Sequence, residues 1–181
     1  MQKGASRGWR VAGREPWVAL LADTHALPRD GRPLLPEILL ASLAGVACIL
    51  HAGDVGCPEV LDRLGAIAPV HAVRGNVDPP DWDLPRRLLL ELRGFRIGLV
   101  HGDQGPGQST PERARRAFAQ DIPDVIVFGH SHRPMVAAEE GGALLVNPGS
   151  PTQPRGLAPT FAILELAGER PRARLVRLPG A

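Results

Sequence analysis

The chain has 181 residues, of which 44% are hydrophobic, and a formal net charge of +2, values typical of an ordinary globular protein. This length suffices for one domain with a sizeable core, and the near balance of 21 basic and 19 acidic residues gives little reason to expect a nucleic-acid partner. No apolar run approaches the roughly 18 residues of a membrane span, and the N-terminus lacks the apolar core of a signal peptide. The two cysteines form neither a CxxC motif nor a disulfide framework. We therefore expect a cytoplasmic protein that does not associate with membranes.

Residues 1–15 are polar and glycine-rich without periodicity, which predicts a flexible lead-in before a single domain over residues 16–181. The first half of that domain alternates short apolar runs with helical patterns. Strands are expected over residues 17–22, 46–50 and 70–73, and helices over residues 34–43 and 58–66. Each helix has proline in its first turn, a favoured position. This alternation predicts an α/β core with parallel strands.

The second half of the domain differs, because hairpins largely replace the helices. Residues 86–92 and 95–100 flank an Arg93-Gly94 turn and predict a β-hairpin, and residues 111–120 predict an arginine-rich helix. The remaining expected elements are a buried strand over residues 124–127, a second hairpin with strands at 136–138 and 143–146, and two final strands at 160–166 and 173–178. Late hairpins in a chain that starts with βα units indicate two packed sheets flanked by helices.

Polar side chains that are costly to bury follow five of the expected strands. In chain order they are Asp23 and His25, Asp54, Asn76 and Asp78, His101, and finally His130 and His132. The carboxyl ends of strands in an α/β sheet lie along one edge, where such folds bind ligands. Carboxylate, imidazole and amide oxygen together suit Mn, Fe, Zn or similar ions. Seven of these residues, all except Asp78, are expected to be ligands. Seven donors are too many for one tetrahedral ion, so we expect two ions about 3.5–4 Å apart that share Asp54.

The Gly129-His130-Ser131-His132 segment directly follows the buried strand expected over residues 124–127. If the chain stays extended there, the two histidines point to the same side, because strand side chains alternate with period two. Their Cα atoms would then be about 6.5–7 Å apart, a suitable spacing for two adjacent ions. A histidine pair alone is explained equally well by chance, so the prediction depends on the other donors.

The ordered motifs resemble those of the calcineurin-like metallophosphoesterases, and among these the small bacterial and archaeal YfcE-like phosphodiesterases. The matching segments are Asp23-Thr24-His25, Gly53-Asp54, Gly75-Asn76-Val77-Asp78, His101-Gly102, Gly129-His130-Ser131-His132 and Asn147-Pro148-Gly149-Ser150. Six motifs in the family's order make the match specific. The resemblance implies a four-layer α/β/β/α sandwich with two mixed β-sheets, and assembly into a homodimer or a larger oligomer.

The resemblance also implies how the donors are divided. One ion would be held by Asp23, His25, Asp54 and His132, and the other by Asp54, Asn76, His101 and His130. Two metals lower the pKa of a bridging water, so that hydroxide can attack phosphorus in line. The expected enzyme is a phosphodiesterase acting on a small-molecule phosphodiester. Manganese is the activator that the resemblance favours, with zinc, iron or nickel as alternatives.

Two positions of the third motif leave the chemistry open. Asp78 is expected to orient a metal ligand from behind, but a turn-forming aspartate before Pro79-Pro80 explains it nearly as well. Many relatives carry a histidine directly after the asparagine of this motif, where it can protonate the leaving group, and this chain has Val77 there. The small phosphodiesterases often lack that histidine too. The departure therefore implies a good leaving group, or a proton supplied by water.

Other functions fit the same motifs. One is a protein-binding scaffold, as in the retromer subunit with this fold, whose third motif departs from the ligand asparagine that is intact here as Asn76. Another is a phosphomonoesterase. Trp82 either stacks on the substrate or is a half-buried surface aromatic, and Arg155 either reaches a phosphate or is a plain surface residue. His51 lies outside the matching motifs, and we expect it to be structural.

Overall fold

The computed structural model describes residues 16–28, 33–138 and 142–179, so the expected lead-in over residues 1–15 lies outside the described part. The first sheet consists of β1 (Trp17–Leu21), β2 (Cys48–His51), β3 (Val70–Ala72), β9 (Thr160–Glu165) and β10 (Arg172–Arg177). The second consists of β4 (Arg87–Leu92), β5 (Phe95–Val100), β6 (Val125–Val127), β7 (Met135–Ala138) and β8 (Leu144–Asn147). The helices are α1 (Glu37–Ser42), α2 (Pro58–Gly65) and α3 (Thr110–Ala117).

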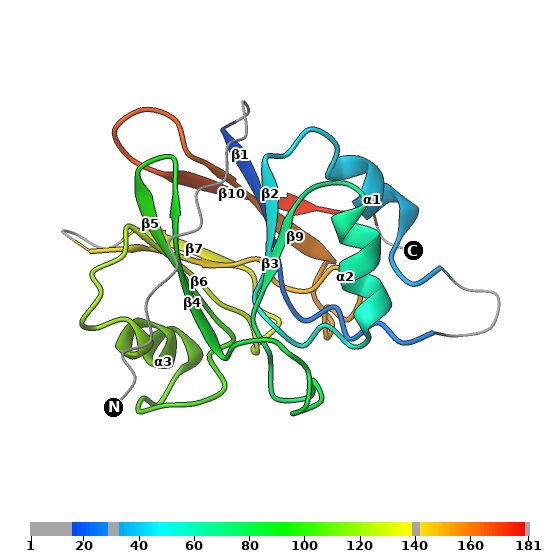
Figure 1. Ribbon diagram of the computed structural model, residues 1–181, viewed down its shortest axis with the longest axis horizontal. Coiled ribbons are helices and arrows are strands. Elements are labelled where there is room, and N and C mark those ends of the chain that lie inside the picture. The colour runs from blue at the N-terminus through cyan, green and yellow to red at the C-terminus, as the bar shows by residue number, and fades with distance from the viewer. Residues whose placement is uncertain (1–15, 29–32, 139–141, 180–181) are drawn as a thin grey trace.

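The two sheets pack face to face, with strand orders β10-β9-β1-β2-β3 and β4-β5-β6-β8-β7. Helices α1 and α2 cover the outer face of the first sheet, and α3 covers the outer face of the second (Figure 1). The predicted four-layer α/β/β/α sandwich is therefore confirmed. Within the described ranges, no helix is long and apolar enough to cross a membrane.

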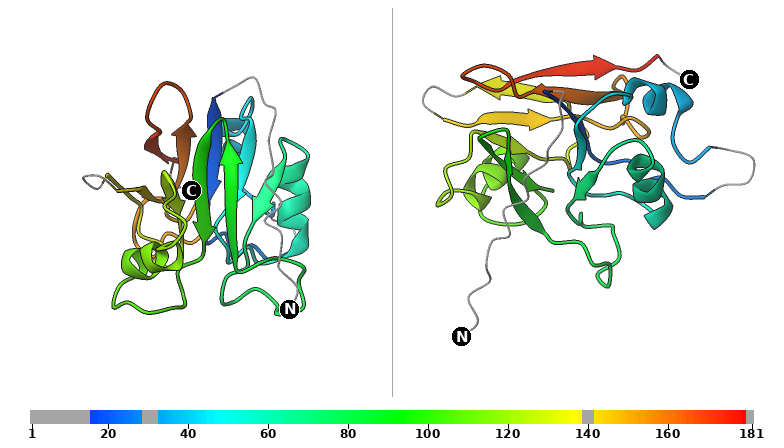
Figure 2. Two further views of the ribbon diagram at one scale, coloured as in Figure 1. Left: turned by 60° about the vertical axis from the view of Figure 1, so that its left-hand side comes forward. Right: turned by 45° about the horizontal axis from the view of Figure 1, so that its top comes forward.

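Strand pairing brings the functional edge together. β1, β2 and β3 are mutually parallel, as are β5, β6 and β8, while β9 runs antiparallel to both β1 and β10. The hairpins β4–β5 and β7–β8 are antiparallel, as expected. Strands β7 and β10, at the edges of the two sheets, lie side by side (Figure 2). Parallel strands thus place the ends of β1, β2, β3, β5 and β6 where ligand sites form in such folds.

The core follows the period-two alternation of the strands. In β1, Val18 and Leu20 face the second sheet, whereas Ala19 and Leu21 face the helices α1 and α2. Because both faces of the strand are covered, its sequence is a continuous apolar run rather than an alternating one. The rigid sandwich therefore fixes the strand ends that carry the polar residues.

Candidate metal centre

All eight polar residues predicted for the site lie at one edge of the sandwich. They are Asp23, His25, Asp54, Asn76, Asp78, His101, His130 and His132, and each contacts at least one other member. This edge is formed by the loops that follow β1, β2, β3, β5 and β6. The strand-end argument thus gave the correct location for every member.

The first group of donors consists of Asp23, His25 and His132, whose ligand atoms lie within 4.8 Å of one another. The Nε2 atoms of His25 and His132 are 3.1 Å apart, and the two rings are stacked. His132 Nε2 lies 3.6 Å from Asp23 Oδ1. Asp23 Oδ2 is buried and has no hydrogen-bond partner in the described part of the chain. A buried, unpartnered carboxylate oxygen beside two imidazoles is the donor set of a metal ligand group.

The second group surrounds Asp54 and Asn76. His101 Nε2 lies 3.2 Å from Asp54 Oδ2 and 3.1 Å from Asn76 Oδ1. His130 Nδ1 is 3.1 Å from the same amide oxygen. Asp54 Oδ2 is also 3.5 Å from His25 Nε2, a member of the first group. Asp54 Oδ2 therefore lies between a histidine of the first group and a histidine of the second.

Backbone carbonyls set the orientation of two of the imidazoles. His101 Nδ1 donates to Ala52 O at 2.8 Å, and His132 Nδ1 donates to Gln153 O at 2.6 Å. In the neutral form of each ring, these bonds place the proton on Nδ1 and leave the lone pair on Nε2, which faces the site. The neighbouring carboxylate oxygens are also acceptors. Imidazole nitrogens, carboxylate oxygens and an amide oxygen that converge in this way fit a metal ion.

Burial and mutual charge shift the titration of the group. Burial raises the pKa of Asp23 to about 7, although His101 acts in the opposite direction. Burial also acts to raise the pKa of Asp54, but the hydrogen bond and charge of His101 outweigh it and lower that pKa. Burial acts to lower the pKa of His101, whose partner Asp54 raises it. Burial lowers the pKa of the other three histidines, His25, His130 and His132.

We expect metal binding to release protons near neutral pH. Asp23, with a pKa of about 7, retains its proton in chelated protein below that pH, and the raised pKa of His101 acts in the same direction. A bound cation displaces those protons. The affinity for Mn²⁺ should therefore weaken between about pH 8 and about pH 6. Calorimetry in two buffers of different ionisation enthalpy measures the release, and identical heats in both buffers would contradict this expectation.

Asp78 lies behind the ligands and organises their backbone. Its carboxylate accepts hydrogen bonds from the N–H groups of Asp54, Val55 and Gly56 at 2.8, 2.8 and 3.2 Å, and from that of Gly75 at 2.8 Å. The side chain is buried and faces these amides. Asp78 thus ties the loop after β2 to the loop after β3. The orienting role and the turn-forming role each describe part of this arrangement.

His51 also supports the site from behind. It is fully buried, and its Nδ1 accepts a hydrogen bond from Gly53 N–H at 3.3 Å. Its Nε2 then donates to Thr24 Oγ1 at 3.0 Å, and that hydroxyl donates to Val55 O at 2.7 Å. Burial lowers the pKa of His51 to about 3, so the ring is neutral. This geometry agrees with the structural role expected for His51.

The Gly129–His132 segment is not extended, and here the prediction was wrong. β6 ends at Val127, and His130 and His132 have φ angles of +67° and +57°, in the left-handed region. Ser131 N–H bonds to Gly129 O at 2.8 Å, and Asn147 Nδ2 donates to the same carbonyl at 2.9 Å. The histidines therefore reach the two donor groups through a tight turn, not through strand alternation.

Other ligands share this unusual backbone. Asp23, His25 and Asp54 have φ angles of +54°, +42° and +55°. Five of the seven predicted ligands thus adopt a conformation that costs a non-glycine residue on the order of 1–3 kcal/mol. The contact between the loops after β2 and β3 is equally tight, since a Cβ added to Gly75 would clash with Asp54 Oδ1. Backbone strain of this kind clusters at functional sites.

The Asn147–Ser150 motif, to which the sequence assigned no specific role, fastens the centre. The side chain of Asn147 holds the turn that carries His130. Ser150 Oγ donates to Asp23 O at 2.7 Å, and Thr152 Oγ1 donates to the carbonyl of the next residue. The loop after β8 therefore fixes the backbone of ligands from both sheets.

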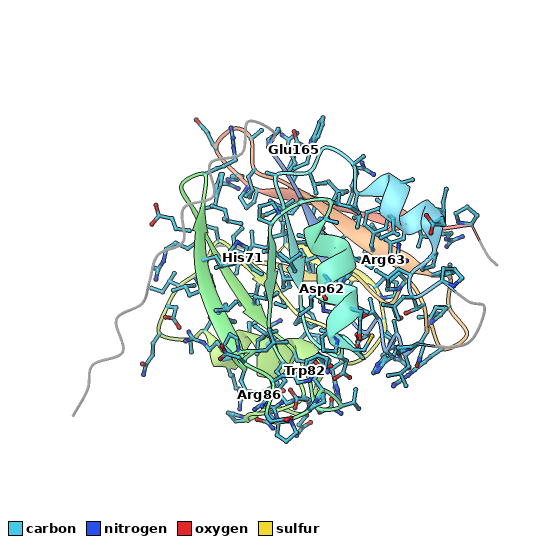
Figure 3. All side chains as sticks on the ribbon, turned by 45° about the vertical axis from the view of Figure 1, so that its right-hand side comes forward. Asp62, Arg63, His71, Trp82, Arg86 and Glu165 are labelled. Carbon is cyan, nitrogen blue, oxygen red and sulfur yellow. The ribbon has the colours of Figure 1, made fainter. Side chains whose placement is uncertain are left out.

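Two residues of the loop between β3 and β4 lie at the same end of the molecule, opposite Glu165 (Figure 3). Trp82 is half-buried and packs against the core between the first sheet and its helices, which agrees with the surface-aromatic alternative. Arg86, which the sequence analysis did not single out, donates to Gly75 O at 3.2 Å and pairs with Asp103 at 3.3 Å. It connects the loops after β3 and β5.

Comparisons with known proteins agree with this geometry. The family model of the calcineurin-like phosphoesterase superfamily domain matches residues 17–169. A protein of Methanothermobacter thermautotrophicus named probable metallophosphoesterase is 37% identical over 161 residues, 88% of this chain and 91% of the relative. The structure of Vps29 from Entamoeba histolytica complexed with Zn²⁺ is 25% identical, with a TM-score of 0.69 over 89% of this chain and 98% of its own. An archaeal phosphodiesterase, 19% identical with a TM-score of 0.65 over 88% and 99% of the two chains, shares the fold. The chain therefore belongs to the calcineurin-like phosphoesterase superfamily.

Proposed function

We propose that this protein is a phosphoesterase with two divalent metal ions that hydrolyses a small phosphodiester. The observation that carries the proposal is the convergence of seven donor side chains, in which Asp54 Oδ2 lies 3.5 Å from His25 Nε2 and 3.2 Å from His101 Nε2. Membership of a metallophosphoesterase family supports hydrolysis of a phosphoester. We further propose that the enzyme prefers a diester over a monoester and that manganese is its activator. The assay described below tests both points.

The proposed ligand sets are Asp23, His25, Asp54 and His132 for one ion, and Asp54, Asn76, His101 and His130 for the other. When bound, two such ions supply a hydroxide nucleophile near neutral pH and neutralise phosphate charge. The role of the protein is to hold these donor side chains in place. The carbonyl oxygens of Ala52 and Gln153 accept hydrogen bonds from Nδ1 of His101 and His132. Asn76 Oδ1 lies within 3.1 Å of both His101 Nε2 and His130 Nδ1.

The leaving group receives no proton from the residue after Asn76. Val77 occupies that place, its side chain is apolar and its surface is 56% exposed. Its backbone N–H donates to Asp54 Oδ1 at 3.0 Å, which fixes the position of the residue at the rim of the site. A leaving group that is stable as an anion needs no acid catalyst. We therefore propose that the natural substrate is a phosphodiester with a good leaving group.

Val77→His should raise kcat/KM for diesters with alkyl leaving groups by about 10- to 100-fold, because an imidazole here can protonate the departing oxygen. Little change is expected for nitrophenyl leaving groups, which need no proton. The exposed position accepts the larger ring without disturbing the core. Val77→Gln, which adds a polar side chain without an acid, is the matched control. A series of diesters of graded leaving-group pKa measures the effect, and a uniform response along the series would count against it.

A protein-binding scaffold is the alternative function. The structural likeness to Vps29, a vacuolar protein sorting protein, raises it. That Vps29 structure is a complex with Zn²⁺, so metal content by itself does not separate a scaffold from an enzyme. Hydrolysis does separate them. The complete donor set, Asn76 included, favours the enzyme.

The test begins with chelated protein reloaded separately with Mn²⁺, Zn²⁺, Fe²⁺ or Ni²⁺. Each sample is assayed on bis(4-nitrophenyl) phosphate and on 4-nitrophenyl phosphate, and its mass in solution is measured by light scattering. We expect Mn²⁺-dependent hydrolysis with the diester preferred, and a dimer or larger assembly. Preference for the monoester would identify a phosphomonoesterase. Metal binding without hydrolysis of either ester would support the scaffold.

A further inference from the structure

The segment that follows Ser150 is fixed against the first donor group. Ser150 Oγ donates to Asp23 O at 2.7 Å, and His132 Nδ1 donates to Gln153 O at 2.6 Å. Thr152 Oγ1 donates a third hydrogen bond, to the carbonyl oxygen of Thr24. The backbone up to residue 153 therefore has a defined position relative to the metal ligands.

Arg155 lies at the tip of a tight turn that starts from this fixed segment. Leu157 N–H donates to Pro154 O at 3.0 Å, and the two central residues, Arg155 and Gly156, have φ angles of +49° and +84°. Two successive left-handed residues are the signature of a type I′ turn, in which glycine, asparagine and aspartate predominate. An arginine in this conformation is uncommon. The first central position of the turn thus carries a long cationic side chain, although glycine, asparagine or aspartate would adopt this backbone conformation at a lower energetic cost.

The guanidinium of Arg155 has no close partner among the described residues. The residue is exposed, and within the described residues it makes no hydrogen bond or ion pair. Its backbone lies two residues from Gln153, whose carbonyl accepts the hydrogen bond from His132 Nδ1 at 2.6 Å, so the turn that carries Arg155 lies beside the first donor group. A free cation beside a metal centre is placed to meet an anionic substrate.

We propose that Arg155 binds non-bridging oxygens of the substrate phosphate at the open side of the group formed by Asp23, His25 and His132. This role rests on the proposed phosphoesterase function. The planar guanidinium offers paired donors that match two phosphate oxygens. Because the turn is fastened to the ligand loops, the backbone of Arg155 has a fixed position beside this group, from which the side chain can reach the phosphate. Arg155 is thereby a substrate-binding residue and not a metal ligand.

The experiment compares Arg155→Ala and Arg155→Lys with Arg133→Ala. Arg133 is an exposed arginine next to His132, so its removal takes away the same charge from a nearby place. Calorimetry measures the binding of inorganic phosphate to Mn²⁺-loaded protein, and assays on bis(4-nitrophenyl) phosphate give kcat and KM. We expect Arg155→Ala to weaken phosphate binding and to lower kcat/KM by about 10- to 100-fold. Arg155→Lys should restore part of both, and Arg133→Ala should resemble the wild type.

Mn²⁺ affinity and the urea midpoint separate substrate binding from a structural role. Both should be undiminished in Arg155→Ala, since the residue contacts no ligand side chain. Wild-type phosphate binding in Arg155→Ala would overturn the proposal, as would a loss of Mn²⁺ affinity or an equal loss in Arg133→Ala. If the wild type hydrolyses no ester while phosphate binding still depends on Arg155, the phosphoesterase function fails and the phosphate site stands.

Discussion

Asp54→Asn should reduce Mn²⁺-dependent phosphodiester hydrolysis by at least about 10³-fold, because the metal pair supplies several kcal/mol of transition-state stabilisation. Asp54 Oδ2 lies 3.2 Å from His101 Nε2 and 3.5 Å from His25 Nε2, so it serves both donor groups at once. The amide replaces one carboxylate oxygen with a donor and removes the negative charge that two cations would share. Steady-state kinetics and the metal content of the same samples measure the two effects together.

The asparagine variant retains an oxygen that can accept the Val77 N–H bond, which limits damage to the fold. Asp62→Asn is the matched control, because Asp62 is an exposed carboxylate on α2 and is not one of the predicted metal donors (Figure 3). It should leave both activity and metal content unchanged. Hydrolysis by Asp54→Asn within tenfold of the wild type would remove the basis for a shared ligand.

Asp78→Ala should lower the free energy of unfolding by roughly 4 kcal/mol or more, because each buried donor left without a partner costs about 1–3 kcal/mol. Four backbone N–H groups use this carboxylate, those of Asp54, Val55, Gly56 and Gly75. The side chain is only 5% exposed, so water cannot readily replace it. Urea unfolding in the presence of a chelator measures the loss without a contribution from bound metal.

Asp83→Ala provides the comparison, since Asp83 is an exposed carboxylate in the same loop. It should change the unfolding free energy by less than about 0.5 kcal/mol. Asp78→Asn should also lower the free energy of unfolding, because its NH₂ group is a donor that faces backbone N–H donors. If Asp78→Ala unfolds at the wild-type urea concentration, Asp78 does not organise the two loops.

The strands were predictable from the sequence more closely than the ends of the helices. A continuous apolar run marks β1 because both of its faces are covered, whereas helix ends depend on single residues. The helix expected from residue 34 begins at Glu37, because Pro36 has an extended backbone at the N-cap. The helix expected to residue 120 ends at Ala117, since Phe118 leaves the helical conformation and packs beneath Gly98 in the core.

For the candidate site, residue types and their order were predictable, and backbone conformation was not. Strand ends carrying Asp, Asn and His place such residues at one edge whatever the local geometry. The left-handed turn at His130 and His132 is fixed by Asn147, a residue on another strand whose contact has no local sequence pattern. For the same reason, the four amides around Asp78 and the Arg86–Asp103 pair became apparent only in three dimensions.

The left-handed backbone conformation of the predicted ligands lowers the stability of the fold at the residues that the proposed chemistry requires. At His130, His132 and Asp23 a glycine would relieve the backbone, and at Asp23 it would also remove a buried oxygen that lacks a partner. The native side chains therefore weaken the fold until a cation binds them, and binding restores stability in proportion to the logarithm of the ion concentration. Under the proposed function, metal supply governs how much of the protein survives as folded enzyme. Starvation for the ion would then lower its abundance as well as its activity.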